Sequence, residues 1–155
     1  GTLKERFKMA KVIAVNISEK KGVAKHPVDK ATLVENFGVL GDAHAGPGIR
    51  QVSLLGIESI NKMKEYGLDG LCTGKFAENI TTESIELFKL SVGNKLKIGE
   101  TLHEVSQIGK KCHAHEGCEI SKKIGICVMP KEGIFTIVLK GGEIKPGDEI
   151  EIVKE

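Results

Sequence analysis

Short stretches of alternating apolar and polar residues dominate the chain, and they predict a structure built mainly from β-strands. The first stretch, residues 11–17, places Ile13, Val15 and Ile17 on one face of a strand. Glycine-rich turns separate these stretches, and the sequence shows no regular alternation of strands with long helices. Further strands are predicted over residues 31–35, 50–55, 93–98, 101–108, 133–139 and 149–153.

Helical spacing occurs in two places. Ile57, Ile60 and Met63 follow one another at the spacing of one helix face, and Gly67 supplies a stop signal. Residues 120–124 indicate a second, short helix. Many short strands with few helices predict an all-β sandwich or barrel.

The length and composition predict a single domain. A chain of 155 residues can bury a sizeable core, and with only 4% aromatic residues Ile, Val and Leu must build it. Residues 1–10 show neither periodicity nor a helix cap, so we expect an extension outside the fold. We therefore predict one domain over residues 11–155.

The charge balance and the apolar runs indicate which classes of partner are excluded, and the cysteines indicate the compartment. The 23 basic and 21 acidic residues give a net charge of +2, which argues against a dedicated nucleic-acid binder. No apolar run approaches the roughly 18 residues that a membrane span needs. The four cysteines occur without a secretory segment, so we interpret them as reduced thiols of a cytoplasmic protein.

The densest group of reactive side chains lies in residues 107–118. Lys110 and Lys111 immediately precede Cys112, two histidines follow it, and Cys118 comes six residues later. A thiol is nucleophilic as its thiolate, and neighbouring cations lower the pKa of a thiol. Cys112 is therefore a candidate reactive thiol, whereas a free cysteine in an apolar run is usually a small buried hydrophobe. Cys72 and Cys127 fit that second description.

The same segment also permits a metal site. Cys112, His115 and Cys118, with His113 or His44, supply the nitrogen and sulfur ligands that zinc prefers. The spacing differs from that of paired Cys-x-x-Cys zinc knuckles. Both alternatives, a reactive thiol and a zinc site, stay open from the residues alone. We assign His103 to a surface or strand position without a function, and we assign His26 likewise.

Two further segments carry polar groups in unusual surroundings. Residues 37–48 contain four glycines and a proline around Asp42 and His44, which suits a metal ligand, an orienting group, a turn cap or a plain surface loop. Glu78 and Asn79 lie between two apolar residues, either in a turn or directed into a pocket.

Six short motifs occur in order between Lys11 and Val153, and together they carry a family resemblance. They are Gly38-x-x-Gly41-Asp42-Ala43-His44, Arg50-Gln51-Val52-Ser53-Leu54, Phe76-Ala77-Glu78-Asn79-Ile80, Val92-Gly93, Cys112 after its lysines, and Gly147-Asp148. With these motifs the chain resembles a stand-alone MOSC-domain protein, similar to the C-terminal domain of molybdenum-cofactor sulfurases.

The resemblance implies a mainly β fold, a MOSC-type β-barrel with a few short peripheral helices. It also implies a sulfur-carrier or sulfurtransferase-like role, with Cys112 accepting sulfane sulfur as a persulfide. Asp42, His44, Arg50 and Asn79 are the other family positions, expected to line one pocket. The family often has glycine where this chain has Ala77, so we expect a slightly different backbone there.

From these roles follows a hypothesis for the chemistry. Lys110, Lys111 and Arg50 would favour both a thiolate and an anionic acceptor such as a pterin phosphate. His44 would orient the acceptor or transfer a proton, which makes it the second catalytic candidate beside Cys112. Asn79 would hydrogen-bond the acceptor.

The resemblance also implies the partners. We expect the molybdenum cofactor (molybdopterin), or another metal–sulfur centre, as ligand or acceptor. We expect no pyridoxal-phosphate site in this chain, so a separate sulfur donor such as a cysteine desulfurase would load Cys112. A module that binds the molybdenum cofactor without turnover is the alternative.

Overall fold

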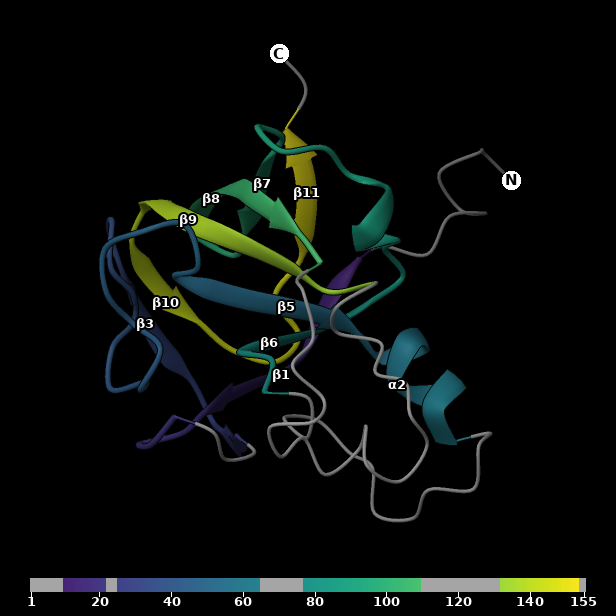
Figure 1. Ribbon diagram of the computed structural model, residues 1–155, viewed down its shortest axis with the longest axis horizontal. Coiled ribbons are helices and arrows are strands. Elements are labelled where there is room, and N and C mark those ends of the chain that lie inside the picture. The colour runs from purple at the N-terminus through teal and green to yellow at the C-terminus, as the bar shows by residue number, and fades with distance from the viewer. Residues whose placement is uncertain (1–9, 22–24, 65–76, 110–131, 154–155) are drawn as a thin grey trace.

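The computed structural model describes residues 10–21, 25–64, 77–109 and 132–153, and this part of the chain is mainly β (Figure 1). It contains a helix α2 (Ile57–Lys64) and a short 3₁₀ helix η1 (Leu87–Lys89). The strands are β1 (Lys11–Ile17), β2 (His26–Val28), β3 (Ala31–Val34), β4 (Gly38–Val39), β5 (Val52–Gly56), β6 (Ile80–Glu83), β7 (Lys95–Ile98), β8 (Thr101–Ile108), β9 (Ile134–Lys140), β10 (Gly142–Ile144) and β11 (Ile150–Val153).

Eight of these strands form one sheet in the order β11-β7-β8-β9-β5-β6-β1-β2. All of its pairs are antiparallel except β5 with β6, which run parallel. The predicted strands at residues 11–17 and 101–108 are confirmed with the same bounds. Burial alternates in the first half of β8, where Thr101, His103 and Val105 are buried. In β1 it does not: residues 14–16 are all buried, and Ile13 and Ile17, which were predicted to share the face of Val15, are only half-buried.

A second sheet of three strands, in the order β10-β3-β4, lies to one side of the larger sheet, and α2 lies on the opposite side (Figure 1). One cluster of buried aliphatic side chains joins the two sheets. It includes Val15, Leu33, Leu54, Ile134 and Ile144, each no more than 2% exposed. Ile, Val and Leu build this core, as the composition predicts.

The predicted barrel is only partly supported by the described strands. The order of the large sheet begins at β11 and ends at β2, so no strand pair in the described ranges closes it. An isolated bridge between Lys11 and Glu149 nevertheless links β1 to the start of β11. Backbone hydrogen bonds from Val12 N to Asp148 O and from Gly147 N to Val12 O accompany it, both 2.8 Å long. The sheet therefore curls toward itself, and full closure stays a prediction.

The helix expected from Ile57 and Ile60 is confirmed as α2, which packs against β5 and β6. Ile60 is fully buried on its inner face. The predicted stop at Gly67 and the short helix at residues 120–124 lie outside the described residues. None of the helices in the described ranges is long and apolar enough to cross a membrane.

The strand register places one row of residues across the middle of the large sheet. Ser53 of β5 pairs with Phe135 of β9, and Phe135 also pairs with Gln107 of β8. On the other side of Ser53, the N–H of Asn79 donates to the carbonyl of Ser53, and the N–H of Asn16 donates to the carbonyl of Asn79. Neighbours in such a row direct their side chains to the same face of a sheet. Asn79, one of the candidate functional residues, belongs to this row.

Candidate functional site

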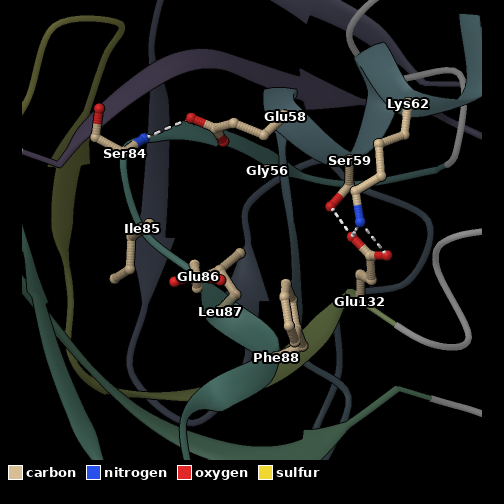
Figure 2. Close-up of a pocket in the computed structure, with 10 residues that line it drawn as sticks. All are labelled: Gly56, Glu58, Ser59, Lys62, Ser84, Ile85, Glu86, Leu87, Phe88 and Glu132. Atoms are coloured by element: carbon tan, nitrogen blue, oxygen red, sulfur yellow. Dashed lines mark hydrogen bonds and ion pairs between the residues drawn. The ribbon is translucent and has the colours of Figure 1, made fainter. Parts of the chain in front are cut away.

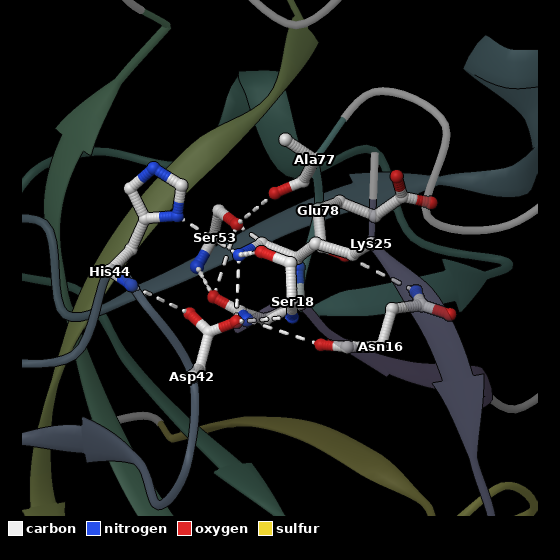
Figure 3. A network of polar contacts seen from close by, with 9 residues as sticks. Asn16, Ser18, Lys25, Asp42, His44, Ser53, Ala77 and Glu78 are labelled. Atoms are coloured by element: carbon white, nitrogen blue, oxygen red, sulfur yellow. Dashed lines mark hydrogen bonds and ion pairs between the residues drawn. The ribbon is translucent and has the colours of Figure 1, made fainter. Parts of the chain in front are cut away.

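A buried ion pair lies at the centre of the site (Figure 3). Lys25 Nζ is 2.7 Å from Asp42 Oδ1, and both side chains are fully buried. The N–H of Ser18 donates to the same carboxylate oxygen over 3.0 Å. Desolvating two charges is costly unless their geometry and further hydrogen bonds compensate, so breaking such a pair from one side is strongly destabilising.

The ionisation of Asp42 follows from these contacts. Burial by itself raises the pKa of this carboxyl group, but the hydrogen bond and charge of Lys25 and the backbone N–H of Ser18 oppose it. The side chain of Asn79 also lowers it, and the net result is a pKa below the ordinary value of 3.8. Asp42 is therefore a carboxylate at neutral pH, and its partners are already present in the fold.

His44 lies at the edge of this buried pair. Its backbone N–H donates to Asp42 Oδ2 over 3.1 Å, and its ring nitrogen Nδ1 is 3.0 Å from Lys25 Nζ. The residue is exposed, unlike Lys25 and Asp42. The glycine-rich loop thus combines an internal carboxylate with an imidazole at the surface, and the role of Asp42 and His44 in a ligand pocket stays a prediction.

Gly38 shows why this loop contains glycine. Its φ is +122°, and a Cβ atom there would lie 2.5 Å from the carbonyl oxygen of Gln51. The backbone of β4 therefore approaches the chain just before β5 more closely than any other residue type permits. This contact holds the start of the loop against the large sheet.

Asn79 ties three strands together. Its Oδ1 accepts hydrogen bonds from the backbone N–H and the hydroxyl of Ser53, at 3.0 and 3.2 Å. Its Nδ2 donates to the carbonyl oxygen of Asn16 over 3.2 Å. Because Asn79 is 1% exposed, these contacts make it a structural link between β1, β5 and the start of β6. Contact with a ligand through this amide stays a prediction.

Glu78 and Ala77 precede Asn79 and complete the network (Figure 3). Glu78 is fully buried, and its Oε2 accepts a 2.6 Å hydrogen bond from the hydroxyl of Thr81. Ala77 has a φ of +64°, in the left-handed region that glycine occupies without strain. Its carbonyl oxygen lies 3.1 Å from Ser53 Oγ, so it shares the single hydroxyl hydrogen of Ser53 with Asn79 Oδ1. The polar pair at residues 78–79 therefore faces the protein interior.

Arg50 precedes β5, and its side chain contacts two members of the row described above. Its Nε donates to Gln107 Oε1 over 2.9 Å, and its guanidinium carbon lies 5.4 Å from the centre of the Phe135 ring. Neighbouring strands are about 4.8 Å apart, so the backbones of Asn79 and Phe135 are separated by about 10 Å. Arg50 is exposed, and these contacts orient a cation beside the buried network. The described contacts do not join Arg50 to Asp42 or Asn79 directly.

The predicted thiol and the groups next to it lie outside the described residues. These are the catalytic candidate Cys112, the cofactor-binding candidates Lys110 and Lys111, and the alternative zinc ligands His113, His115 and Cys118. The two ends of this undescribed segment are close together, because the N–H of Gly109 donates to the carbonyl of Gly133 over 2.7 Å. Within the described ranges, no group of three or more His, Cys, Asp or Glu side chains could hold a metal ion.

A separate pocket of about 410 Å³ opens between α2 and η1 (Figure 2). Glu132 accepts hydrogen bonds from Ser59 Oγ over 2.6 Å and from Lys62 Nζ over 2.7 and 2.9 Å. Lys62 also lies 5.9 Å from the centre of the Phe88 ring. This pocket lies at the C-terminal ends of β5 and β6, away from the Asp42 network. Its lining residues are Gly56, Glu58, Ser59, Lys62, Ser84, Ile85, Glu86, Leu87, Phe88 and Glu132.

Comparison with known proteins identifies the family. The sequence profile of the MOSC domain matches residues 41–151. The chain belongs to the MOSC family. The matched region contains both predicted loop residues, Asp42 and His44, and ends within β11.

A Bacillus subtilis protein is similar in sequence to this MOSC domain. The chain is 26% identical over 145 residues to the uncharacterized protein YflK of Bacillus subtilis (strain 168). The aligned region covers 85% of this chain and 63% of YflK. The chain thus spans less than two thirds of the length of this relative.

Solved structures support the fold. The YuaD protein from B. subtilis has a TM-score of 0.76 at 18% identity, over 94% of this chain and 96% of that one. YiiM from Geobacillus stearothermophilus has a TM-score of 0.68 at 19% identity, over 94% of this chain and 75% of that one. At these identities the similarity shows a shared fold.

Lys25 is the residue of this MOSC domain that sequence reasoning missed. It stands in a charged stretch that reads as a surface loop, and its side chain is nevertheless fully buried. The available signal was weak: Lys25 follows an apolar pair, Val23 and Ala24, and precedes the extended His26. Its burial depends on Asp42, which lies 17 positions away along the chain.

Proposed function

We propose that this MOSC domain is a sulfur carrier, which accepts sulfane sulfur on Cys112 as a persulfide and delivers it to an acceptor. The acceptor class would be a metal–sulfur centre or the molybdenum cofactor. Support comes from membership of the MOSC family, which is related to the C-terminal domain of molybdenum-cofactor sulfurases. The thiol of Cys112 follows two lysines, whose charges favour the nucleophilic thiolate.

One structural observation carries most weight in this proposal. A buried ion pair between Lys25 and Asp42 supports His44 at the surface of the glycine-rich loop. Buried charges are costly, and perturbed carboxyl groups cluster at functional sites. A surface turn at residues 41–48 does not by itself require a buried lysine beneath it.

The loading step would be a thiol–disulfide type of exchange. The Cys112 thiolate attacks the terminal sulfur of a persulfide on the donor protein, a new S–S bond forms on Cys112, and the donor cysteine leaves as a thiolate. Delivery repeats this exchange with the acceptor as nucleophile. The acceptor attacks the terminal sulfur, the S–S bond breaks, and Cys112 returns as a thiolate.

The described residues would bind the acceptor rather than move the sulfur. Arg50 presents a guanidinium group that is oriented by Phe135 and Gln107, and guanidinium groups bind phosphate through paired N–H donors. His44 offers an exposed imidazole at the edge of the Lys25–Asp42 pair. Both groups suit an anionic acceptor such as a pterin phosphate. Both carboxylate oxygens of Asp42 already accept hydrogen bonds, so its role here is support.

Sulfur loading can be measured directly. The full chain is incubated with a cysteine desulfurase, pyridoxal phosphate and cysteine, and its intact mass is measured without reductant. We expect a gain of one sulfur atom on the wild-type protein and none on Cys112→Ala. Cys72→Ala is the matched control and should load like the wild type. Absence of added sulfur on the wild type, or equal loading of Cys112→Ala, would exclude the carrier role.

Binding without turnover is the second candidate function, and the exposed, oriented Arg50 favours it. A binding module would retain the molybdenum cofactor in Cys112→Ser and lose affinity in Arg50→Gln. Under the carrier proposal Cys112→Ser also abolishes sulfur transfer. The alternative zinc site at Cys112, His115 and Cys118 predicts one zinc per chain after purification with a chelator, which metal analysis of the same protein would detect.

A further inference from the structure

The ammonium group of Lys25 is surrounded by three hydrogen-bond acceptors. They are Asp42 Oδ1 at 2.7 Å, His44 Nδ1 at 3.0 Å and Ser18 Oγ at 3.3 Å. An ammonium group has three hydrogens and no lone pair, so these contacts use its whole donor capacity. We propose that Lys25 is a positioning residue, which holds His44 as a neutral imidazole with an unprotonated Nδ1 and with the ring proton on Nε2.

The chemistry of the Lys25–His44 contact determines which nitrogen carries the proton. Only a nitrogen with a free lone pair can accept a hydrogen bond from an ammonium group. If Nδ1 carried a hydrogen, two N–H groups would point at each other across 3.0 Å. The neutral tautomer with its hydrogen on Nε2 avoids that conflict. Figure 3 shows the second ring nitrogen on the far side of the ring from Lys25.

Asp42 keeps Lys25 charged and in place. Its Oδ1 contacts Lys25 Nζ, and its Oδ2 accepts the backbone N–H of His44 rather than a ring hydrogen. The carboxylate therefore fixes both the lysine and the main chain of the histidine. Lys25 faces the ring of His44 with a positive charge, and a second positive charge on that ring would be repelled. The hydrogen bond from Lys25 to Nδ1 and the charge of Lys25 both oppose protonation of His44.

The inference changes the expected role of His44. A histidine that transfers protons must gain and lose a proton near neutral pH. Held by Lys25, His44 is instead a hydrogen-bond donor through Nε2, suited to an oxygen or sulfur acceptor on a bound ligand. A carbonyl, phosphate or thiolate group would accept this hydrogen bond. The inference concerns the state of His44 and does not depend on sulfur transfer by Cys112.

The wild-type protein provides the first test. Long-range ¹H–¹⁵N NMR spectra of the full chain with labelled histidines report the tautomer of each ring, and the spectrum of His44→Gln assigns the His44 signals. We expect the Nε2–H tautomer and a titration midpoint below the usual histidine value of about 6.5. A hydrogen on Nδ1, or a His44 that is charged at pH 7, would overturn the proposal.

A pair of variants tests the part played by Lys25. The double variant Lys25→Met with Asp42→Asn removes both buried charges together, because a single change would leave an unpaired charge inside the protein. The titration midpoint of His44 is expected to rise, because the direct contact of its ring with the Lys25 ammonium is lost, whereas the Asp42 carboxylate removed with it contacts only the backbone N–H of His44. The matched control is Lys21→Met, at an exposed position of the same loop, which should leave the midpoint unchanged.

The outcomes separate this proposal from the proposed function. An unchanged midpoint in a folded double variant would contradict the role of Lys25, whatever the sulfur-loading assay shows. If that variant does not fold, the tautomer and titration midpoint of His44 in the wild-type protein still test whether His44 is held as a neutral imidazole. Failure of sulfur loading on Cys112 together with the expected His44 spectrum would refute the carrier role and leave the state of His44 established.

Discussion

At the scale of single residues, the number of hydrogens that a buried polar group can donate determines which hydrogen bonds it makes. His103 is an example outside the site. Its Nε2 lies 3.0 Å from Thr101 Oγ1, and Thr101 already donates its own hydrogen to the carbonyl of Ile98 over 2.7 Å. Thr101 must therefore accept a hydrogen from Nε2, and Nδ1 accepts the hydroxyl hydrogen of Thr136. His103 lies on a strand as expected, but its side chain is completely buried.

The burial of His103 makes stability depend on pH. Burial lowers the pKa of His103 from 6.5 to about 3, so between these values the unfolded chain binds a proton that the folded protein does not. Stability is full above pH 6.5 and should fall by about 1.4 kcal/mol per pH unit as the pH decreases toward 3. The loss of Asp42 as a stabilising carboxylate begins only below its ordinary value of 3.8, so Asp42 does not contribute between pH 6.5 and 4.5. His44, whose midpoint we also expect below 6.5, contributes equally to the wild type and to a variant of His103, so comparing the two isolates the effect of His103.

Urea unfolding at several pH values between 7 and 4.5 measures this effect. His103→Gln keeps a polar side chain between the two threonines and cannot titrate, so its stability should vary less with pH than that of the wild type. The difference in slope should approach one proton, about 1.4 kcal/mol per pH unit. Equal slopes for the two proteins would show that His103 does not titrate between its folded and unfolded values.

At the scale of elements, one side chain joins strands that are distant along the chain. Asn79 precedes β6 and bonds to Ser53 on β5 and to Asn16 on β1. Glu78 and Thr81 reinforce the junction, since Asn16 Nδ2 donates to the carbonyl of Glu78 and to Thr81 Oγ1. The parallel pairing of β5 with β6 lacks a tight turn to hold it, and these side chains provide part of that constraint.

Replacing Asn79 by alanine should destabilise the protein strongly. The change removes three hydrogen bonds and leaves the N–H of Ser53 and the carbonyl of Asn16 buried without this partner. Each buried polar group left unsatisfied costs about 1–3 kcal/mol, so we expect a loss of about 3 kcal/mol or more.

Asn94→Ala is the matched control for this substitution. Asn94 Oδ1 accepts a 2.9 Å hydrogen bond from the N–H of Ser91 in an exposed turn, where water can replace it. We expect a loss of about 1 kcal/mol or less, measured by the same urea unfolding experiment. Similar losses for the two variants would mean that Asn79 is not a special link between strands.

At the scale of the whole molecule, the core is densest where the sheet has strands on both sides. All five residues of β5 are buried, and β5 lies between β9 and β6. Among the strands that the structure describes, β2 forms an end of the sheet and pairs only with β1, and it has two exposed residues and one half-buried residue. The start of β1 also contacts the start of β11 through the bridge at Lys11, so β1 is held from several directions.

Hydrogen exchange should reveal this gradient. Paired amides of β5 and β9 are expected to exchange only through global unfolding, and those of β2 through local opening, at least about a hundredfold faster. Exchange measured residue by residue by NMR in the native protein tests the prediction. Equal protection of β2 and β5 would indicate that the edge strand is covered in solution.

Local pattern alone determined much of the β structure. The strands at residues 11–17 and 101–108 and the start of α2 at Ile57 were predictable, because the alternation or the helical spacing of apolar residues is a property of neighbouring positions. The ordered motifs also identified the MOSC family. Closure of the barrel and the position of Cys112 remain predictions.

The tertiary structure decided the site. The sequence near Lys25 gives only a weak signal that its side chain is buried, because the compensating partner Asp42 comes from another loop. The same holds for Asn79 with Ser53, and for His103 between threonines of two strands. The cost of burying a polar group depends on which partners surround it in space, and only the folded chain brings those partners together.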